Sequence, residues 1–291
     1  MKKILMQSLF ALASTLAAGS ALASCANCAK WNTDQAPFAL YGNSYYVGVH
    51  GLSAVLITSP SGHVLIDGGL PESAPLVEAH IRQLGFRPED IKYILSSHTH
   101  FDHAGAIAEL QRISGATVIA SAASAKVLET GVSAKDDPQY EDSEPQFTPV
   151  AHVRVAHDGE VLKLGAADVT VHATFGHTPG STSWTWQSCA DGRCEHMVYA
   201  DSLTAVTNDR YQFIDHPAYV AAMQHSIDVV AALPCDVLVS AHPEFADLWT
   251  REAKRAQLGQ RAFIDSGACR AYAAHARTGL AQRLDEERQA K

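Results

Sequence analysis

The chain has 291 residues, of which 47% are hydrophobic and 18% charged, and its formal net charge is −9 at pH 7. This composition is typical of a globular protein and excludes low-complexity and collagen-like chains. The modest acidic excess, without a basic stripe in the sequence, argues against nucleic acid as a partner. The length suits one large domain or two small ones. Since no Pro-, Gly- or Ser-rich linker interrupts the sequence, we predict a single domain over 24–291.

Residues 1–23 have the layout of a secretory signal peptide. A positive start, Lys2-Lys3, precedes a mostly apolar run over 4–18, and Ala21-Leu22-Ala23 supplies the A-x-A cleavage pattern. The apolar run is short for a transmembrane span. We therefore expect export to the periplasm and a mature chain without a membrane-spanning segment.

The end of this segment leaves an alternative open. Leu22-Ala23-Ser24-Cys25 also resembles a bacterial lipobox, in which Cys25 would be lipidated and would anchor the protein to a membrane. In that form Cys28 would keep a free thiol. Without lipidation, Cys25 and Cys28 form a C-x-x-C pair.

The predicted elements form two β-rich stretches, each followed by helices. In the first half we predict strands over 44–49, 53–58, 63–67, 91–96 and 117–120, and helices over 74–84, 103–113 and 122–130. In the second half we predict strands over 153–156, 161–164, 169–173, 183–187, 197–200 and 237–241, and helices over 217–233 and 247–275. Two such halves predict two packed sheets with helices on the outside.

A polar, Pro-containing segment over 131–150 separates the two halves, and we predict a long loop there. Loops of this length in compact domains are often functional. A merely solvated insertion explains the same composition equally well, so the sequence leaves both interpretations open.

Four further cysteines fit an exported protein, because disulfides persist in oxidising compartments. Cys189 and Cys194 flank a turn-like stretch and can face each other across a hairpin. Cys235 and Cys269 can tie a late strand to the C-terminal helix. Sequence alone does not fix the connectivity, but these two pairings are favoured.

The strongest chemical signal is His98-Thr99-His100-Phe101-Asp102-His103, where an apolar strand passes into a helix. Imidazole and carboxylate are zinc ligands, and catalytic zinc sites leave a position open for water. A single His is usually a surface or core residue, but four ligand-type side chains this close beside a buried strand are hard to explain in that way. We predict a metal site in which His98 and His100 face one ion and Asp102 and His103 face a second.

Two more His residues are candidates to complete the site. His177 lies in the tight turn Gly176-His177-Thr178-Pro179-Gly180, after the predicted strand over 169–173. His242 directly follows the predicted strand over 237–241. Because both lie at strand ends, as the first cluster does, we expect them to complete the site.

These motifs resemble the metallo-β-lactamase superfamily: H-x-H-x-D-H, then G-H-T-P-G, a strand-end A-D-S and a strand-end His, over about 41–242. The resemblance implies an α/β fold of the α+β type, an αββα four-layer sandwich with two Zn²⁺ ions at one edge. The first zinc would be held by His98, His100 and His177, and the second by Asp102, His103 and His242. Asp67 matches an early strand-end Asp of the family, which orients ligands from outside the coordination sphere.

Tyr199-Ala200-Asp201-Ser202-Leu203-Thr204 discriminates within the superfamily. Ser202, where one large subclass has a Cys ligand, resembles the third subclass of true β-lactamases, as do the cysteine pairs named above. Ser202 and Thr204 would then bind the substrate carboxylate. Asp201 keeps a rival open, because in glyoxalase II-like and lactonase-like relatives an Asp near this place bridges the metals.

The resemblance implies hydrolysis of the β-lactam amide of penicillins, cephalosporins and carbapenems, and hence antibiotic resistance. A water between two zinc ions would lose a proton and attack the amide carbonyl, with Asp102 as the catalytic residue that orients it and relays a proton. We expect a monomer whose partner is a small-molecule β-lactam. Two alternatives remain: a hydrolase of the same fold acting on a thioester or lactone, and a non-catalytic zinc-binding protein.

Overall fold

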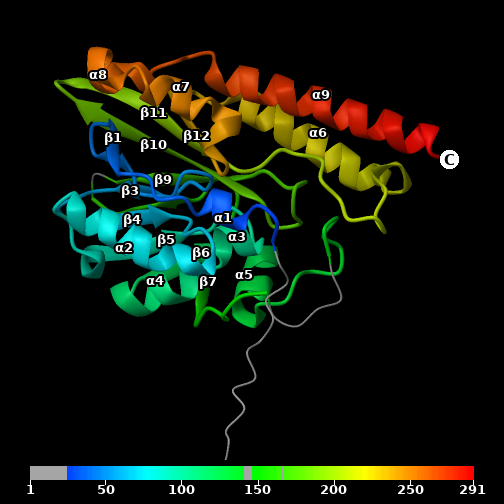
Figure 1. The fold of residues 1–291 in the computed structure, drawn as a ribbon, viewed down its shortest axis with the longest axis horizontal. Helices are drawn as coiled ribbons and strands as arrows, with labels where there is room; N and C mark the ends of the chain where they lie inside the picture. The colour runs from blue at the N-terminus through cyan, green and yellow to red at the C-terminus, as the bar shows by residue number, and fades with distance from the viewer. Residues whose placement is uncertain (1–24, 141–145, 166) are drawn as a thin grey trace, which may run out of the picture.

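The computed structural model describes residues 25–140, 146–165 and 167–291, so the predicted signal peptide lies outside the described residues. In this part of the chain two β-sheets pack face to face between two layers of helices (Figure 1). The seven strands of the first sheet are adjacent in chain order: β1 Phe38–Tyr41, β2 Ser44–Tyr46, β3 Val55–Ile57, β4 His63–Ile66, β5 Ile91–Leu95, β6 Thr117–Ala120 and β7 Val153–Val155.

The second sheet has five strands in the described residues, in the order β12-β11-β10-β9-β8. Their bounds are β8 Val161–Leu162, β9 Val169–Ala173, β10 Thr182–Ala190, β11 Arg193–Ala200 and β12 Val237–Ser240. Strand β12 pairs with β11 in parallel, whereas the other pairs in this sheet are antiparallel.

Alternating side chains of each strand enter different cores. Val55 and Ile57 of β3 face the core between the sheets, where Trp184 of β10 and Tyr199 of β11 are fully buried, while Leu56 packs against the helices on the other side. Because both faces of β3 and β4 are buried, their sequences are almost continuously apolar.

Helices cover both outer faces. The first sheet is covered by α2 Ala74–Gln83, α4 Ile107–Ser114 and α5 Ala122–Thr130, and the second by α6 Pro217–Ala232 and α9 Ala268–Gln289 (Figure 1). Burial of these apolar faces stabilises the layers by roughly 25 cal/mol per Å² removed from water. The arrangement confirms the predicted αββα sandwich.

The helix predicted over 103–113 is instead two helices, α3 Phe101–Ala104 and α4. The break has a tertiary cause. Pro71 lies so close to Gly105 that a side chain there would clash with it, and the Ala106 amide donates to Gly69 O at 3.2 Å instead of to a helical carbonyl. The glycine permits this close approach and positions the turn over 97–103 that carries the His cluster, here called the His turn.

The prediction of one terminal helix over 247–275 is wrong. The structure has α7 Leu248–Glu252, α8 Arg255–Leu258 and a 3-10 turn, Gly259–Phe263, before α9, which continues to Gln289. Gly259 has φ +58° and ends the helical path, and the Asp265 amide donates to Asp236 O beside the second sheet. The sequence reading also missed β1 and the short helix α1 Cys28–Trp31.

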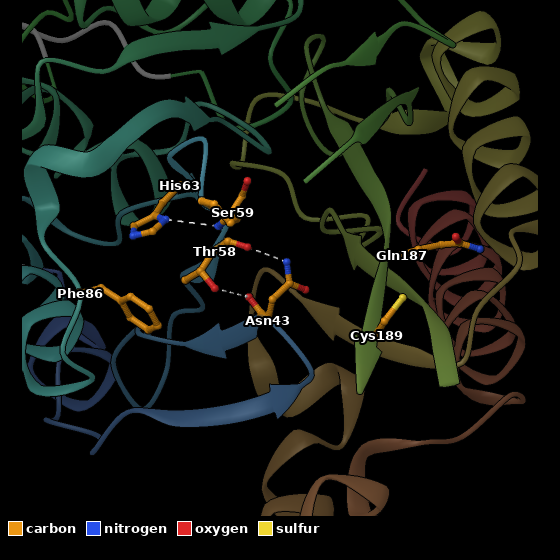
Figure 2. A pocket seen from close by; sticks show the side chains of 8 residues that line it. Asn43, Thr58, Ser59, His63, Phe86, Gln187 and Cys189 are labelled. Carbon is orange, nitrogen blue, oxygen red and sulfur yellow. Dashed lines mark hydrogen bonds between the residues drawn. The ribbon is translucent and has the colours of Figure 1, made fainter. Parts of the chain in front are cut away.

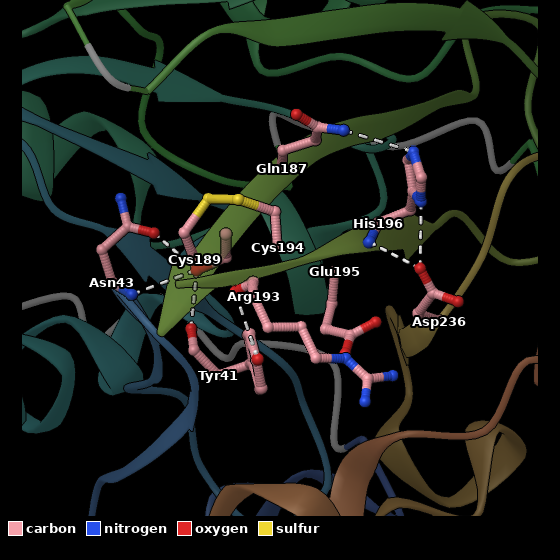
Figure 3. The surroundings of a disulfide bond; sticks show 10 residues. Tyr41, Asn43, Gln187, Cys189, Arg193, Cys194, Glu195, His196 and Asp236 are labelled. Atoms are coloured by element: carbon pink, nitrogen blue, oxygen red, sulfur yellow. Dashed lines mark hydrogen bonds and ion pairs between the residues drawn. A yellow bond between two sulfur atoms is a disulfide. The ribbon is translucent and has the colours of Figure 1, made fainter. Parts of the chain in front are cut away.

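All six cysteines are paired. The favoured pairs Cys189–Cys194 and Cys235–Cys269 are disulfides, and Cys25 is bonded to Cys28. Figure 3 shows the 189–194 bridge joining β10 to β11 near their shared turn. Among the described residues, we find no helix with the length and apolarity needed to cross a membrane.

Candidate metal centre

The predicted ligands meet at one edge of the two sheets. His98 and His100 follow β5, His103 lies on α3, His177 lies in the turn between β9 and β10, and His242 follows β12. This edge is closed by hydrogen bonds between the sheets, such as the one that the Thr182 amide donates to Ser97 O at 2.8 Å. The fold therefore brings together side chains that are 144 positions apart in the sequence, from 98 to 242.

One candidate ligand group consists of His98, His100 and His177, whose nearest ligand atoms all lie within 4.8 Å of one another. The rings are edge-to-face, with centroids 4.9 Å apart for His98 and His100 and 4.8 Å apart for each of these rings and His177. Three imidazoles at this spacing can converge on one ion.

The second group combines Asp102 and His103, again within 4.8 Å of His98. His242 reaches it from the other sheet: its Nε2 atom lies 3.2 Å from His103 Nε2 and 3.5 Å from Asp102 Oδ2. Two imidazole nitrogens facing each other beside a carboxylate form an arrangement that suits a shared cation.

Contacts behind the rings leave one nitrogen of each aimed at the centre. His98 Nδ1 donates to Asp201 Oδ1 at 2.7 Å, His177 Nδ1 to Thr204 O at 3.0 Å and His242 Nδ1 to Gly51 O at 3.1 Å. The remaining nitrogen of His98, Nε2, is buried and has no hydrogen-bond partner among the described residues. Outer contacts of this kind fix the tautomer of metal-binding His residues, so the donor set fits zinc.

The hydrogen bond from His98 places the Asp201 carboxylate outside the two ligand groups. Asp201 is fully buried and belongs to neither candidate ligand group. Its carboxylate lies behind His98, and the Tyr272 hydroxyl donates to its carbonyl at 2.9 Å. A carboxylate shared between the two ligand groups would have favoured a lactonase-like site. The Asp201 carboxylate instead orients His98 from outside both groups.

In the described part of the chain, Asp67 contacts Ser97 and Tyr199 and no candidate metal ligand through its carboxylate hydrogen bonds. It follows β4 with φ +57°, a left-handed conformation that Asp tolerates better than most residues. Its carboxylate accepts hydrogen bonds from Ser97 N at 2.7 Å, Ser97 Oγ at 2.5 Å and Tyr199 OH at 2.8 Å. Asp67 thus holds the residue that starts the His turn, and burial raises its pKa to about 6.

The two residues expected to bind substrate differ in setting. Ser202 is 1% exposed, and its hydroxyl has no hydrogen-bond partner among the described residues. Thr204 is half-buried, and its Oγ1 lies 3.1 Å from His177 Nδ1. The contact between Thr204 and His177 was not predicted.

The electrostatics favour the neutral form of three of the rings, those of His98, His177 and His242. Burial, reinforced by the neighbouring His100, lowers the pKa of His177 to about 4, and burial with the charge of His103 lowers that of His242 to about 4. Burial also lowers the pKa of His98 well below its usual range. Neutral imidazole is the metal-binding form, so these rings are ready to bind at neutral pH.

Asp102 and His103 shift each other's pKa in opposite directions. Burial opposes ionisation of Asp102, but the positive charge of His103 outweighs it and holds the pKa of Asp102 well below its usual range. Conversely, burial alone would lower the pKa of His103, and the Asp102 carboxylate raises it overall. In the metal-free protein the Asp102 carboxylate therefore favours the protonated form of His103, at the position where the second ion would bind.

Two further contacts at the site were not predicted from the sequence. Asp137, in the loop over 131–150, lies with Oδ2 3.2 Å from His100 Nε2. The Trp31 ring lies 5.2 Å from the His242 ring, and the Gly51 amide donates to Trp31 O. The acidic loop composition was a signal for the first contact, but nothing in the sequence pairs Trp31 with His242.

A cavity of about 500 Å³ lies elsewhere, lined by Asn43, Thr58, Ser59, Pro60, His63, Phe86, Gln187 and Cys189 (Figure 2). It lies at the Cys189 end of β10. Thr182, whose amide donates to Ser97 O, lies at the other end of this strand. Cys189 lies seven residue steps along the strand from Thr182, which is about 23 Å at the usual rise per residue. This cavity is distinct from the metal centre.

Comparison with curated proteins finds short matches. Ribonuclease TTHA0252 of Thermus thermophilus is 30% identical over 161 residues, which cover 52% of this chain and 35% of the ribonuclease. N-acyl homoserine lactonase AttM of Agrobacterium fabrum is 39% identical over 74 residues, 18% of this chain and 28% of the lactonase. The chain thus spans about a third of the length of these curated relatives.

Solved structures match over nearly their whole length. The subclass B3 metallo-β-lactamase MEM-A1, from a soil metagenome library, is 55% identical with a TM-score of 0.87, covering 90% of this chain and 100% of that one. The metallo-β-lactamase SMB-1 bound to 2-mercaptoethanesulfonate is 50% identical, with a TM-score of 0.86 and coverage of 88% and 99%. MIM-1 of Novosphingobium pentaromativorans is 44% identical, with a TM-score of 0.84 and coverage of 89% and 93%.

A family model described as the metallo-beta-lactamase superfamily matches residues 47–242. That range contains every predicted metal ligand, from His98 to His242, and Asp67. Together with the solved structures, it shows that the chain belongs to the metallo-β-lactamase superfamily and, within it, to subclass B3.

Proposed function

We propose that this protein is a zinc-dependent β-lactamase that hydrolyses the β-lactam amide of penicillins, cephalosporins and carbapenems. The observation that carries the proposal is the convergence of two ligand groups at the sheet edge, in a chain that matches subclass B3 enzymes over 88–90% of its length. Asp201 behind His98, outside both groups, favours this function over a lactonase-like one.

Two Zn²⁺ ions per chain are part of the proposal. His98, His100 and His177 would hold the first, and Asp102, His103 and His242 the second. Support comes from the tautomers that the outer hydrogen bonds impose and from the buried, unpartnered Nε2 atom of His98. Zinc supplies a water of lowered pKa and an electrophile for the substrate carbonyl.

The residues of this chain do the positioning. Asp102, ionised at neutral pH, would accept a hydrogen bond from the attacking water and take its proton. Ser202 and Thr204 would bind the substrate carboxylate, a role supported by the buried Ser202 hydroxyl without a partner. Asp67 would orient the His turn from outside the coordination sphere through Ser97.

The same proposal covers the cellular setting. Three disulfides fit an exported protein, and we propose a periplasmic, monomeric enzyme whose mature chain is a single domain over 24–291. Its activity would confer resistance to β-lactam antibiotics. The Cys25–Cys28 disulfide supports the unlipidated form of Cys25.

The test is elemental analysis of the purified protein together with hydrolysis assays. We expect about two zinc ions per chain, opening of a penicillin, a cephalosporin and a carbapenem, and loss of all three activities with a chelator. A homoserine lactone and a thioester serve as alternative substrates. Zinc-loaded protein that is inert to β-lactams but cleaves one of these would overturn the proposal, and zinc without any hydrolysis would indicate a binding protein.

A further inference from the structure

In the described part of the loop over 131–150, residues 131–140 and 146–150, one carboxylate is buried. Asp137 is 5% exposed, whereas its neighbour Asp136 is exposed. The Asp137 carboxylate lies 3.2 Å (Oδ2) and 3.4 Å (Oδ1) from His100 Nε2 and also accepts a hydrogen bond from the Gln139 amide at 2.8 Å. Because the ring donates to the carboxylate through Nε2, the Nδ1 atom of His100 is left for a ligand.

The backbone fixes Asp137 in a tight turn. Its amide donates to Ala134 O at 3.0 Å, and its carbonyl accepts from the Tyr140 amide at 2.9 Å. At the two ends of the loop, the Gln146 amide donates to Gly131 O and the Val150 amide to Leu128 O, which attaches the loop to the end of α5. The carboxylate is therefore held by the fold.

A second attachment links the loop to the segment after β11. The Asn208 amide donates to Pro138 O at 3.1 Å, and the Asn208 side chain donates to Tyr140 O. That segment also carries Asp201 and Thr204, which contact His98 and His177. The three His residues of the first group are thus oriented by two segments that are hydrogen-bonded to each other.

We propose that Asp137 is a positioning residue that couples the loop over 131–140 to the first metal site. The inference rests on the proposed zinc centre. The carboxylate fixes the ring plane and tautomer of His100 and strengthens it as a donor, an effect that changes metal affinity about 10- to 100-fold in comparable sites. Since such coupling is reciprocal, zinc at the first site also stabilises the turn around Asp137.

The simpler alternative is that Asp137 only shapes its own turn, through the hydrogen bond from the Gln139 amide. The substitution Asp137→Asn separates the two roles. An Asn oxygen still accepts the bond from Gln139, since Asn and Asp support the same turn, but the charge facing His100 is lost. Asp137→Ala removes both, and Asp136→Asn changes the same charge at the neighbouring exposed position.

The experiment measures zinc affinity by competition with a chelating dye and amide hydrogen exchange of 131–140 with and without zinc. We expect Asp137→Asn to weaken zinc binding at the first site about 10- to 100-fold, and to abolish the protection that zinc gives this loop. Asp136→Asn should match the wild type. Asp137→Glu, which keeps the charge, should recover part of the affinity.

Asn208→Ala cuts the second attachment without touching His100 and provides an independent variant if Asp137→Asn does not fold. It should weaken zinc binding several-fold and raise exchange at 138–140. The inference would be overturned if Asp137→Asn kept wild-type zinc affinity and zinc-dependent protection. If only Asn208→Ala folds, the same result in that variant would overturn it. Either outcome would leave the proposed function intact. Failure of the wild type to bind zinc would overturn both.

Discussion

Asp201 accepts a hydrogen bond from His98 at 2.7 Å, and both side chains are fully buried. The bond selects the His98 tautomer that leaves Nε2 for a metal. Asp201→Ala should therefore lower zinc affinity and kcat/KM, by about 10- to 100-fold for affinity, since it leaves the buried Nδ1–H with only Ser97 Oγ, at 3.3 Å, as an acceptor among the described residues. Zinc titration and steady-state kinetics measure both effects. Asp191→Asn, in the exposed β10–β11 turn, is the matched control, and an Asp201→Ala variant that behaves like it would refute the orienting role.

Asp67 should contribute mainly to stability. Its replacement by Ala removes three hydrogen bonds and leaves the buried Ser97 N without its acceptor, a loss that costs about 1–3 kcal/mol. The Tyr199 hydroxyl keeps Ser53 O, at 3.1 Å, as an acceptor. Tyr199→Phe removes one of the three bonds to Asp67 together with the contact to Ser53 O, keeps both Ser97 contacts and should cost about 1 kcal/mol. Urea unfolding of the metal-free variants gives the free energies, and equal losses for the two variants would contradict this assignment.

The two metal sites should respond differently to acid. The pKa of His177 is lowered to about 4 and that of His98 well below its usual range, so both stay neutral as the pH falls through 6. The pKa of His103 is raised, so a proton competes with the second ion at a higher pH. Zinc content after dialysis at successive pH values should therefore fall in two steps, with the second ion leaving first. Release of both ions in a single step, or retention of the second alone, would contradict the assignment.

The Cys235–Cys269 disulfide should stabilise the fold more than Cys189–Cys194. The sequence separation is 34 for Cys235–Cys269 and 5 for Cys189–Cys194. For loops of these sizes the chain-entropy model gives stabilisations of about 4 kcal/mol and about 2 kcal/mol, respectively. Double Cys→Ala variants compared by urea unfolding test the order. Equal costs would mean that loop closure is not the main source of the stabilisation.

Much of the architecture could be predicted because its signals are local. The strand over 169–173 and the helix over 122–130 have the predicted bounds, since each has a clear period and a clear stop. The His turn was recognisable because its ligands are adjacent in sequence. Its fine structure was not, since the break at Gly105 depends on contact with Pro71 from a distant segment.

The outer contacts of the site were harder to foresee. Asp137 lies 37 positions from His100, and no period or motif relates them. Asp201 was recognised as decisive, but only the folded chain shows that it lies behind His98. The terminal helix was misplaced because the pattern over 247–275 gives no sign that the Asp265 backbone joins Asp236.

The ligands come from both sheets: His98 and His103 follow strands of the first, and His177 and His242 follow strands of the second. Neither half of the molecule carries a full set. An ion bound with native affinity therefore reports that the two halves have docked correctly, and a chain folded in only one half would release it readily. Under zinc limitation, the fraction of molecules that resist proteolysis should therefore rise with the zinc concentration, because bound ions stabilise the form in which the two halves are packed together.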